Sequence, residues 1–255
     1  MREYYITDDG IRLHIKLDMP VGWPEDSEDG KCPLAIVIHG LTGNMEERHI
    51  RAVARLMNEL GVASLRVEMY GHGQSEGDFE QHNLFKWLNN AMTVADHAAS
   101  LDFVSDLYVC GHSQGGLTTV MLAGMKPELF KAAIPLSPAT MIAEAARGGR
   151  SFGTEFDPDH IPEEIYVNSE QKVSGNYLRA AQMLDVDYAI KRYNRPVLIV
   201  HGSDDEAVPL RCAEEAAGKY NNARLAVIEG DDHCYNYHLD QMLEAVRSFM
   251  ETVMR

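Results

Sequence analysis

Gly111-His112-Ser113-Gln114-Gly115 lies between two apolar segments with different patterns. Residues 107–110, before it, form a short apolar run that is typical of a buried strand. Residues 117–122, after it, carry the apolar series of a helix that packs on this strand. Such a setting forces Ser113 into a sharp strand-to-helix turn, with its hydroxyl exposed above the edge of the sheet. The glycines fit this turn because side chains at their positions would collide with the neighbouring strand and helix.

The segments around this turn alternate between strand and helix patterns. Short apolar runs predict strands over residues 34–38, 62–67, 132–136, 197–200 and 225–228. Apolar residues at helical spacing predict helices over residues 50–60, 84–95, about 210–220 and 239–253. A turn at Asp8-Asp9-Gly10 indicates a hairpin before this series. The alternation predicts an α/β fold with a mostly parallel central sheet and helices on both of its faces.

The alternation is interrupted at about residues 139–186. Gly148-Gly149, Asp157-Pro158 and Gly175-Asn176 mark turns there instead of a regular pattern. A segment of this length inside a compact domain is typically a lid or a binding insertion. The alternative is a surface elaboration without a ligand. We therefore expect one domain over residues 1–255, with a lid insertion at about 139–186.

Composition excludes several classes of protein. The 255 residues are 45% hydrophobic, which suits one domain with a sizeable core. A formal net charge of -16 argues against binding of nucleic acid and against adhesion to anionic membranes. No apolar run approaches the length of a membrane span, and residues 1–5 lack the apolar region of a signal peptide. Four cysteines without Cys-x-x-Cys spacing indicate neither zinc nor a disulfide framework. These features predict a cytoplasmic protein.

Ser113 requires a base and an orienting carboxylate, because a serine hydroxyl is a poor nucleophile until a neighbouring group removes its proton. His233 follows the last predicted strand and precedes the last helix, at the sheet edge where open α/β sheets carry their sites. We therefore expect His233 to be the base. His238, at the start of that helix, is expected to be structural or solvated. His201 ends a strand and is expected to make a buried hydrogen bond.

Three adjacent carboxylates follow the strand over residues 197–200, namely Asp204, Asp205 and Glu206. We favour Asp205 as the group that accepts the Nδ1 proton of His233 and stays ionised while the imidazolium forms. Asp204 is the main alternative. Glu206 is the third candidate for the acid, and otherwise it would only keep the loop solvated.

A second loop points to stabilisation of negative charge. His39-Gly40-Leu41-Thr42-Gly43 follows the predicted strand over residues 34–38. The backbone N–H groups of Leu41 and Gln114 are expected to converge on the oxyanion of a tetrahedral intermediate. A plain strand-to-helix turn is the alternative interpretation of residues 39–43.

Together these blocks resemble the α/β-hydrolase superfamily, and the resemblance covers nearly the whole chain. The chain order of serine, acid and histidine in that superfamily matches Ser113, Asp205 and His233. Tyr70-Gly71-His72-Gly73-Gln74-Ser75-Glu76-Gly77 is similar to its loop after the strand that precedes the serine turn. A closer similarity, to bacterial feruloyl (cinnamoyl) esterases of intestinal and rumen organisms, extends through residues 39–43, 111–116, 136–139, 156–162, 175–179, 201–209 and 230–235.

The resemblance implies a serine carboxylesterase that cleaves hydroxycinnamate (ferulate-type) esters through a Ser-His-Asp acyl-enzyme mechanism. It supports Asp205 over Asp204, because the acid of these esterases is the fifth residue of the His-Gly segment. The lid tyrosine that helps to hold the phenolic ring corresponds to Tyr177. The mechanism needs no metal or organic cofactor, and the implied partners are a small aromatic ester and, by analogy, a second copy of the chain. Apolar lid residues are expected to grip the acyl group, namely Met141, Ile142 and Phe152.

The sequence departs from some relatives at Ala145 and Phe152, where those relatives place polar lid side chains against the phenolic hydroxyls. The preference among ferulate, caffeate and coumarate esters is therefore open. A monoacylglycerol lipase or a short-chain acyl carboxylesterase would use the same chemistry on another substrate. A non-catalytic small-molecule receptor on a hydrolase fold would typically have lost a member of the triad, and none is missing here.

Overall fold

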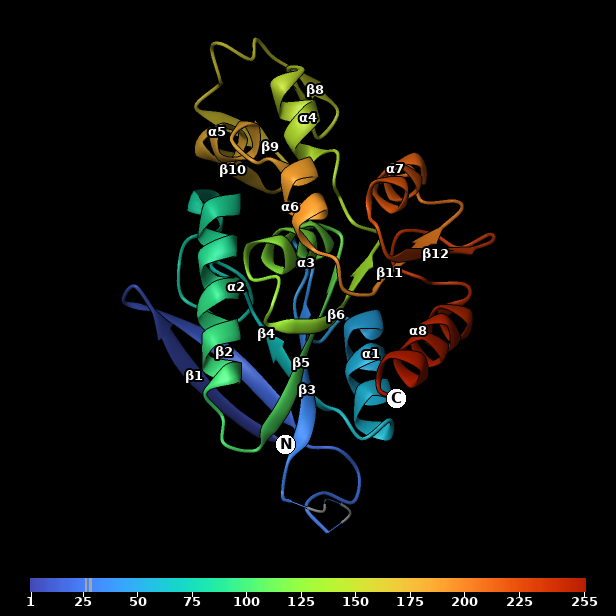
Figure 1. Ribbon diagram of the computed structural model, residues 1–255. Helices are drawn as coiled ribbons and strands as arrows, with labels where there is room; N and C mark the ends of the chain where they lie inside the picture. The colour runs from blue at the N-terminus through green and yellow to red at the C-terminus, as the bar shows by residue number, and fades with distance from the viewer. Residues whose placement is uncertain (26, 28) are drawn as a thin grey trace.

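Figure 1 shows the computed structural model, which describes residues 1–25, 27 and 29–255. One large sheet crosses the molecule in the strand order β1-β2-β4-β3-β5-β6-β11-β12. Strand β2 is antiparallel to both of its neighbours, and the pairs from β4 to β12 are parallel. The prediction of a mostly parallel sheet is thus confirmed. The strands are β1 (Arg2–Asp8), β2 (Ile11–Asp18), β3 (Cys32–Ile38), β4 (Ala63–Val67), β5 (Val104–His112), β6 (Phe130–Leu136), β11 (Val197–Gly202) and β12 (Ala223–Ile228).

Helices cover both faces of this sheet, as the alternation in the sequence predicts. Strand β3 shows why, because Leu34, Ile36 and Ile38 belong to one buried cluster while Ala35 and Val37 belong to another. A strand that is buried on both faces has no polar side to show to water. On the first face pack α2 (Leu84–Ala99), α3 (Gln114–Met125), α6 (Val186–Arg192) and α7 (Arg211–Lys219). On the opposite face pack α1 (Arg48–Glu59) and α8 (Leu239–Val253).

The chain leaves the sheet after β6 and returns to it at β11. Between them, residues 139–186 form an insertion at one end of the molecule, at the top of Figure 1. Its apolar side chains share a buried cluster with the first turns of α2 and with α3. The insertion thereby lies against the helix that follows the serine turn. Its elements are α4 (Ile142–Arg147), β7 (Arg150–Ser151), β8 (Thr154–Glu155), β9 (Glu164–Tyr166), β10 (Lys172–Ser174) and α5 (Asn176–Gln182).

The strand order reverses at the pair of β3 and β5, since β4 lies on one side of this pair and β6 on the other. Ligands of open α/β sheets bind at such a switch point, beyond the carboxyl ends of the strands. The loop after β3 and the turn after β5 therefore meet at the place where a site is expected. A short 3-10 helix, η1 (Phe79–Gln81), precedes α2 beside this region. Among the described residues, no helix has both the length and the apolar character needed to cross a bilayer.

Candidate active site

Ser113 occupies a strained turn between β5 and α3. Its φ of 57° and ψ of -117° lie in a region that residues with a Cβ rarely adopt. A hydrogen bond of 2.9 Å from its backbone N–H to the carbonyl oxygen of Leu136 holds the turn against the neighbouring strand. A Cβ at Gly111 would collide with the carbonyl oxygen of Gly115, and one at Gly115 would collide with that of His39. These collisions confirm the reason that the sequence gives for the two glycines.

The loops after β11 and β12 bring Asp205 and His233 together. Oδ2 of Asp205 lies 2.7 Å from Nδ1 of His233. Oδ1 of Asp205 accepts the backbone N–H groups of Ala207 and Val208 at 2.9 and 2.8 Å. Because Nδ1 donates to the carboxylate, the remaining ring nitrogen, Nε2, is the one able to accept a proton.

The two other carboxylates of this loop point elsewhere. Asp205 is buried, whereas Asp204 and Glu206 are exposed. Asp204 accepts a hydrogen bond of 2.8 Å from the hydroxyl of Ser203. The structure therefore brings Asp205, and neither of its neighbours, to His233.

The carboxylate of Asp205 is held in its ionised form. Burial opposes the charge, but hydrogen bonds from His201 and His233 outweigh burial, so the pKa of Asp205 lies well below its ordinary value. Nε2 of His201 lies 3.2 Å from Oδ2 of Asp205 and 2.8 Å from the carbonyl oxygen of Val208. We expected a buried hydrogen bond for His201 from the sequence, but not its contact with Asp205. The sequence signal for this contact was that His201 and Asp205 lie four positions apart at the end of a strand.

His112 ties the histidine loop to the serine turn. Its ring centroid lies 4.6 Å from that of His233, and its Nε2 donates to the carbonyl oxygen of His233 at 2.7 Å. Burial, followed by the charges of His49 and His233, keeps the pKa of His112 far below its ordinary value, so this ring is neutral. The residue directly before Ser113 thus fixes the backbone of His233. No local pattern in the sequence predicts this partner of His112.

The Ser113 side chain is half-buried and does not cap α3, so its hydroxyl is free for another partner. Within the described part of the chain, this hydroxyl forms no hydrogen bond to Nε2 of His233. Catalytic hydrogen bonds are often long without substrate and shorten when it binds. The contact between Ser113 and His233 stays a prediction.

The loop after β3 packs directly on the serine turn. A Cβ at Gly40 would lie only 3.1 Å from Cβ of Ser113, so glycine allows a close approach that would be tight for any other residue. Nδ1 of His39 donates to the carbonyl oxygen of Gly40 at 2.7 Å, and Nε2 accepts the backbone N–H of Met69 at 3.1 Å. Burial, with help from the charge of His72, lowers the pKa of His39 to about 3. His39 is therefore neutral and holds this loop in one geometry.

Leu41 and Gln114 flank Ser113 from these two loops. Leu41 follows Gly40, whose carbonyl is fixed by His39. Gln114 is the first residue of α3, where backbone N–H groups have no partner inside the helix and the helix dipole is positive. This arrangement suits stabilisation of an oxyanion, and the roles of the two N–H groups stay predictions.

Tyr177 is completely buried, with an exposed fraction of 0%. Its hydroxyl donates to Oε1 of Gln114 at 2.8 Å, and its ring centroid lies 5.5 Å from that of Phe152. Tyr177 thereby links α5 of the insertion to the first residue of α3. Phe152 is half-buried, as are Met141 and Ile142, which pack on a separate small cluster around Val208.

We expect Tyr177→Phe to destabilise the protein, because it leaves Oε1 of the buried Gln114 without a donor. A buried polar atom left without its partner costs about 1–3 kcal/mol. Thermal unfolding followed by circular dichroism measures the loss as a lower Tm. Tyr188→Phe is the control, since the Tyr188 ring is 58% exposed. Equal Tm values for the two variants would show that the Tyr177 hydrogen bond does not contribute.

Comparison with known proteins gives both a family and a fold. The model of the prolyl oligopeptidase family matches residues 48–254. The structure of Est1E from Butyrivibrio proteoclasticus with ferulic acid bound is similar over 98% of this chain and 99% of that one. The two sequences are 51% identical, and the TM-score is 0.95. An α/β-hydrolase fold is therefore confirmed.

Curated relatives are more distant. The human mitochondrial palmitoyl-protein thioesterase ABHD10 is 23% identical over 204 residues, which cover 78% of this chain. The chain spans 65% of the length of that relative. Feruloyl esterase B from Thermothelomyces thermophilus is 32% identical over 119 residues, which cover 46% of this chain and 38% of that protein.

Proposed function

The chain belongs to the prolyl oligopeptidase family of α/β-hydrolases, and from this premise we propose that it is a serine carboxylesterase that cleaves hydroxycinnamate esters of the ferulate type. The observation that carries the proposal is the bond between buried Asp205 and half-buried His233, which His112 ties to the strained turn at Ser113. The 51% identity to a protein with ferulic acid bound supports the choice of substrate.

In the proposed mechanism, Ser113 attacks the ester carbonyl carbon while Nε2 of His233 takes the hydroxyl proton. Asp205 stabilises the imidazolium that results. The backbone N–H groups of Leu41 and Gln114 hold the oxyanion of the tetrahedral intermediate. His233 then protonates the leaving alcohol, which leaves the acyl group on Ser113. A water activated by His233 hydrolyses this acyl-enzyme, so that the acid leaves and the serine hydroxyl is restored.

The insertion over residues 139–186 is proposed to be the lid that holds the aromatic acyl group. Half-buried apolar side chains support this role, since Met141, Ile142 and Phe152 all come from the insertion. The ring of Tyr177 packs near Phe152, and its hydroxyl is bound to Gln114 beside the nucleophile. Tyr177 would therefore support the acyl pocket with its ring, because its hydroxyl is already bonded to Gln114.

We place the protein in the cytoplasm as part of the same proposal. Its four cysteines are free, and three of them are buried, which suits a reducing compartment. The homodimer implied by the resemblance is a further proposal, which analytical ultracentrifugation would test.

A panel of esters tests the substrate. We expect kcat/KM for methyl ferulate to exceed that for methyl hexanoate by about tenfold to 200-fold, the range that apolar pocket contacts give. Methyl p-coumarate and methyl caffeate would rank the phenolic substituents, with Ser113→Ala as the blank. A preference for medium alkyl chains or for a monoacylglycerol would support the lipase or short-chain esterase instead. No turnover, together with no labelling of Ser113 by a fluorophosphonate, would support the receptor.

A further inference from the structure

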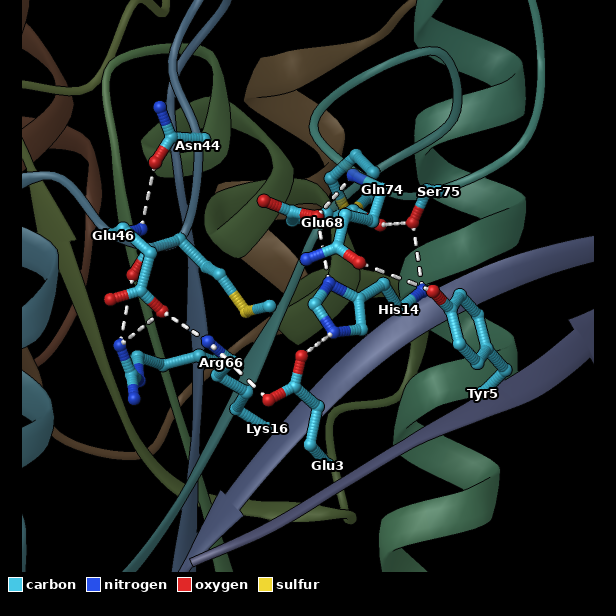
Figure 2. Close-up of polar contacts among 12 residues, drawn as sticks. Glu3, Tyr5, His14, Lys16, Asn44, Glu46, Arg66, Glu68, Gln74 and Ser75 are labelled. Atoms are coloured by element: carbon cyan, nitrogen blue, oxygen red, sulfur yellow. Dashed lines mark hydrogen bonds and ion pairs between the residues drawn. The ribbon is translucent and has the colours of Figure 1, made fainter.

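His14 is buried between two carboxylates near the edge of the sheet (Figure 2). Its Nδ1 lies 2.8 Å from Oε2 of Glu68, and its Nε2 lies 2.6 Å from Oε1 of Glu3. The exposed fractions of His14 and Glu68 are 1% and 4%. Ionised carboxylates accept hydrogen bonds and do not donate them. The ring therefore satisfies both neighbours only when both of its nitrogens carry a proton.

The pairing of β1 with β2 builds this arrangement. Glu3 is opposite Lys16, and Tyr5 is opposite His14. The ring of Tyr5 stacks on the imidazole with a centroid distance of 5.2 Å. Nζ of Lys16 lies 3.6 Å from Oε2 of Glu3 and 3.0 Å from Oε1 of Glu46. The groups nearest to the ring are thus carboxylates, whose negative charge favours an imidazolium.

Glu68 is also the anchor of the loop after β4. Its carboxylate accepts the backbone N–H of Gln74, and its carbonyl oxygen accepts the hydroxyl of Ser75. The oxygen of the same Ser75 hydroxyl accepts the backbone N–H of His14 at 2.8 Å. Figure 2 shows Gln74 and Ser75 gathered around Glu68 and His14. The position of this loop therefore depends on the contacts of Glu68.

The next residue connects this loop to the candidate oxyanion site. Met69 donates its backbone N–H to Nε2 of His39 at 3.1 Å. His39 donates in turn to the carbonyl oxygen of Gly40, the residue before Leu41. A continuous series of bonds thus runs from the ring of His14 to the loop that presents the Leu41 N–H.

We propose that His14, as an imidazolium, is a positioning residue that holds the Leu41 loop through Glu68, Met69 and His39. This inference rests on the proposed function for its effect on catalysis, whereas the charge of His14 can be measured without any substrate. Loss of the proton leaves one carboxylate against a ring lone pair, and buried charges without a partner are strongly unfavourable. The loop then loosens, and kcat falls.

The charge of His14 is tested first by NMR of the imidazole nitrogens in uniformly ¹⁵N-labelled protein, with His14→Gln used for assignment. We expect both nitrogens of His14 to be protonated at neutral pH. His160 provides the reference signal, because its exposed ring pairs with Asp157 at 2.7 Å. An unprotonated ring nitrogen in His14 at neutral pH would overturn the proposal.

The effect on catalysis is tested by steady-state kinetics of methyl ferulate hydrolysis at neutral pH. Glu3→Gln removes the charge of one of the two carboxylates that favour the imidazolium, so kcat should fall. His14→Gln should lower kcat by about tenfold with KM unchanged, because misplaced oxyanion donors affect the transition state alone. Glu128→Gln, at an exposed carboxylate outside the insertion, should match the wild type.

Values of kcat for Glu3→Gln and His14→Gln that equal the wild-type value would refute the positioning role. If the wild type hydrolyses no ester at all, the proposed function fails instead, and the NMR result still decides the charge of His14.

Discussion

Ser113→Ala is expected to lower kcat for methyl ferulate by about 10⁶-fold, the size of loss that follows removal of the nucleophile from a serine triad. The proposed acyl-enzyme forms on this hydroxyl, so no part of the covalent route survives without it. Alanine at φ 57° carries the same backbone strain as serine, and we expect an unchanged Tm. Activity within about tenfold of the wild type would assign the nucleophile to another residue.

Asp205→Asn is expected to lower kcat by about 10⁴-fold, because an amide at this position favours the wrong tautomer of His233. Asp204→Asn is the matched control, one residue away on the same loop. The Asp204 side chain is exposed, and among the described residues its one hydrogen bond is to its neighbour Ser203, so its substitution should change kcat by no more than about twofold. Steady-state kinetics of both variants give the ratio. A larger effect at Asp204 would reverse the assignment of the acid.

The same pair of variants tests the charge of Asp205. A carboxyl whose pKa is lowered by folding contributes stability above its ordinary pKa of about 3.9, and that contribution is lost as the pH falls further. The wild type should therefore lose stability as the pH falls below about 4. Asp205→Asn should remove part of this loss, whereas Asp204→Asn should retain it. Urea unfolding at several acidic pH values provides the measurement.

Much of the fold could be predicted because periodicity is local. The apolar run before Ser113 and the helical spacing after it lie within a few residues of the turn, and both elements occur where the sequence places them. The regular strands and helices before residue 139 and after residue 192 follow in the same way, whereas the short helix α6 was not predicted. The short strands β7, β8, β9 and β10 were not predicted, because two or three residues are too few to show a period.

The contacts that shape the site could not be predicted, because they join residues far apart in the chain. His112 donates to the carbonyl of a residue 121 positions later, and Tyr177 donates to a residue 63 positions earlier. No local pattern specifies which side chains meet across the sheet. The choice of Asp205 over Asp204 was supported by resemblance, and the structure supplies a physical reason in the burial of Asp205 and its backbone partners.

The most direct measurement is the location and stoichiometry of labelling by a fluorophosphonate, with methyl ferulate hydrolysis followed on the same sample. The account predicts one label per chain, on the peptide that contains Ser113, and activity lost in proportion to labelling. It also predicts much slower labelling of Asp205→Asn than of Asp204→Asn. Label on another residue, or full hydrolysis of methyl ferulate by the labelled protein, would contradict the account.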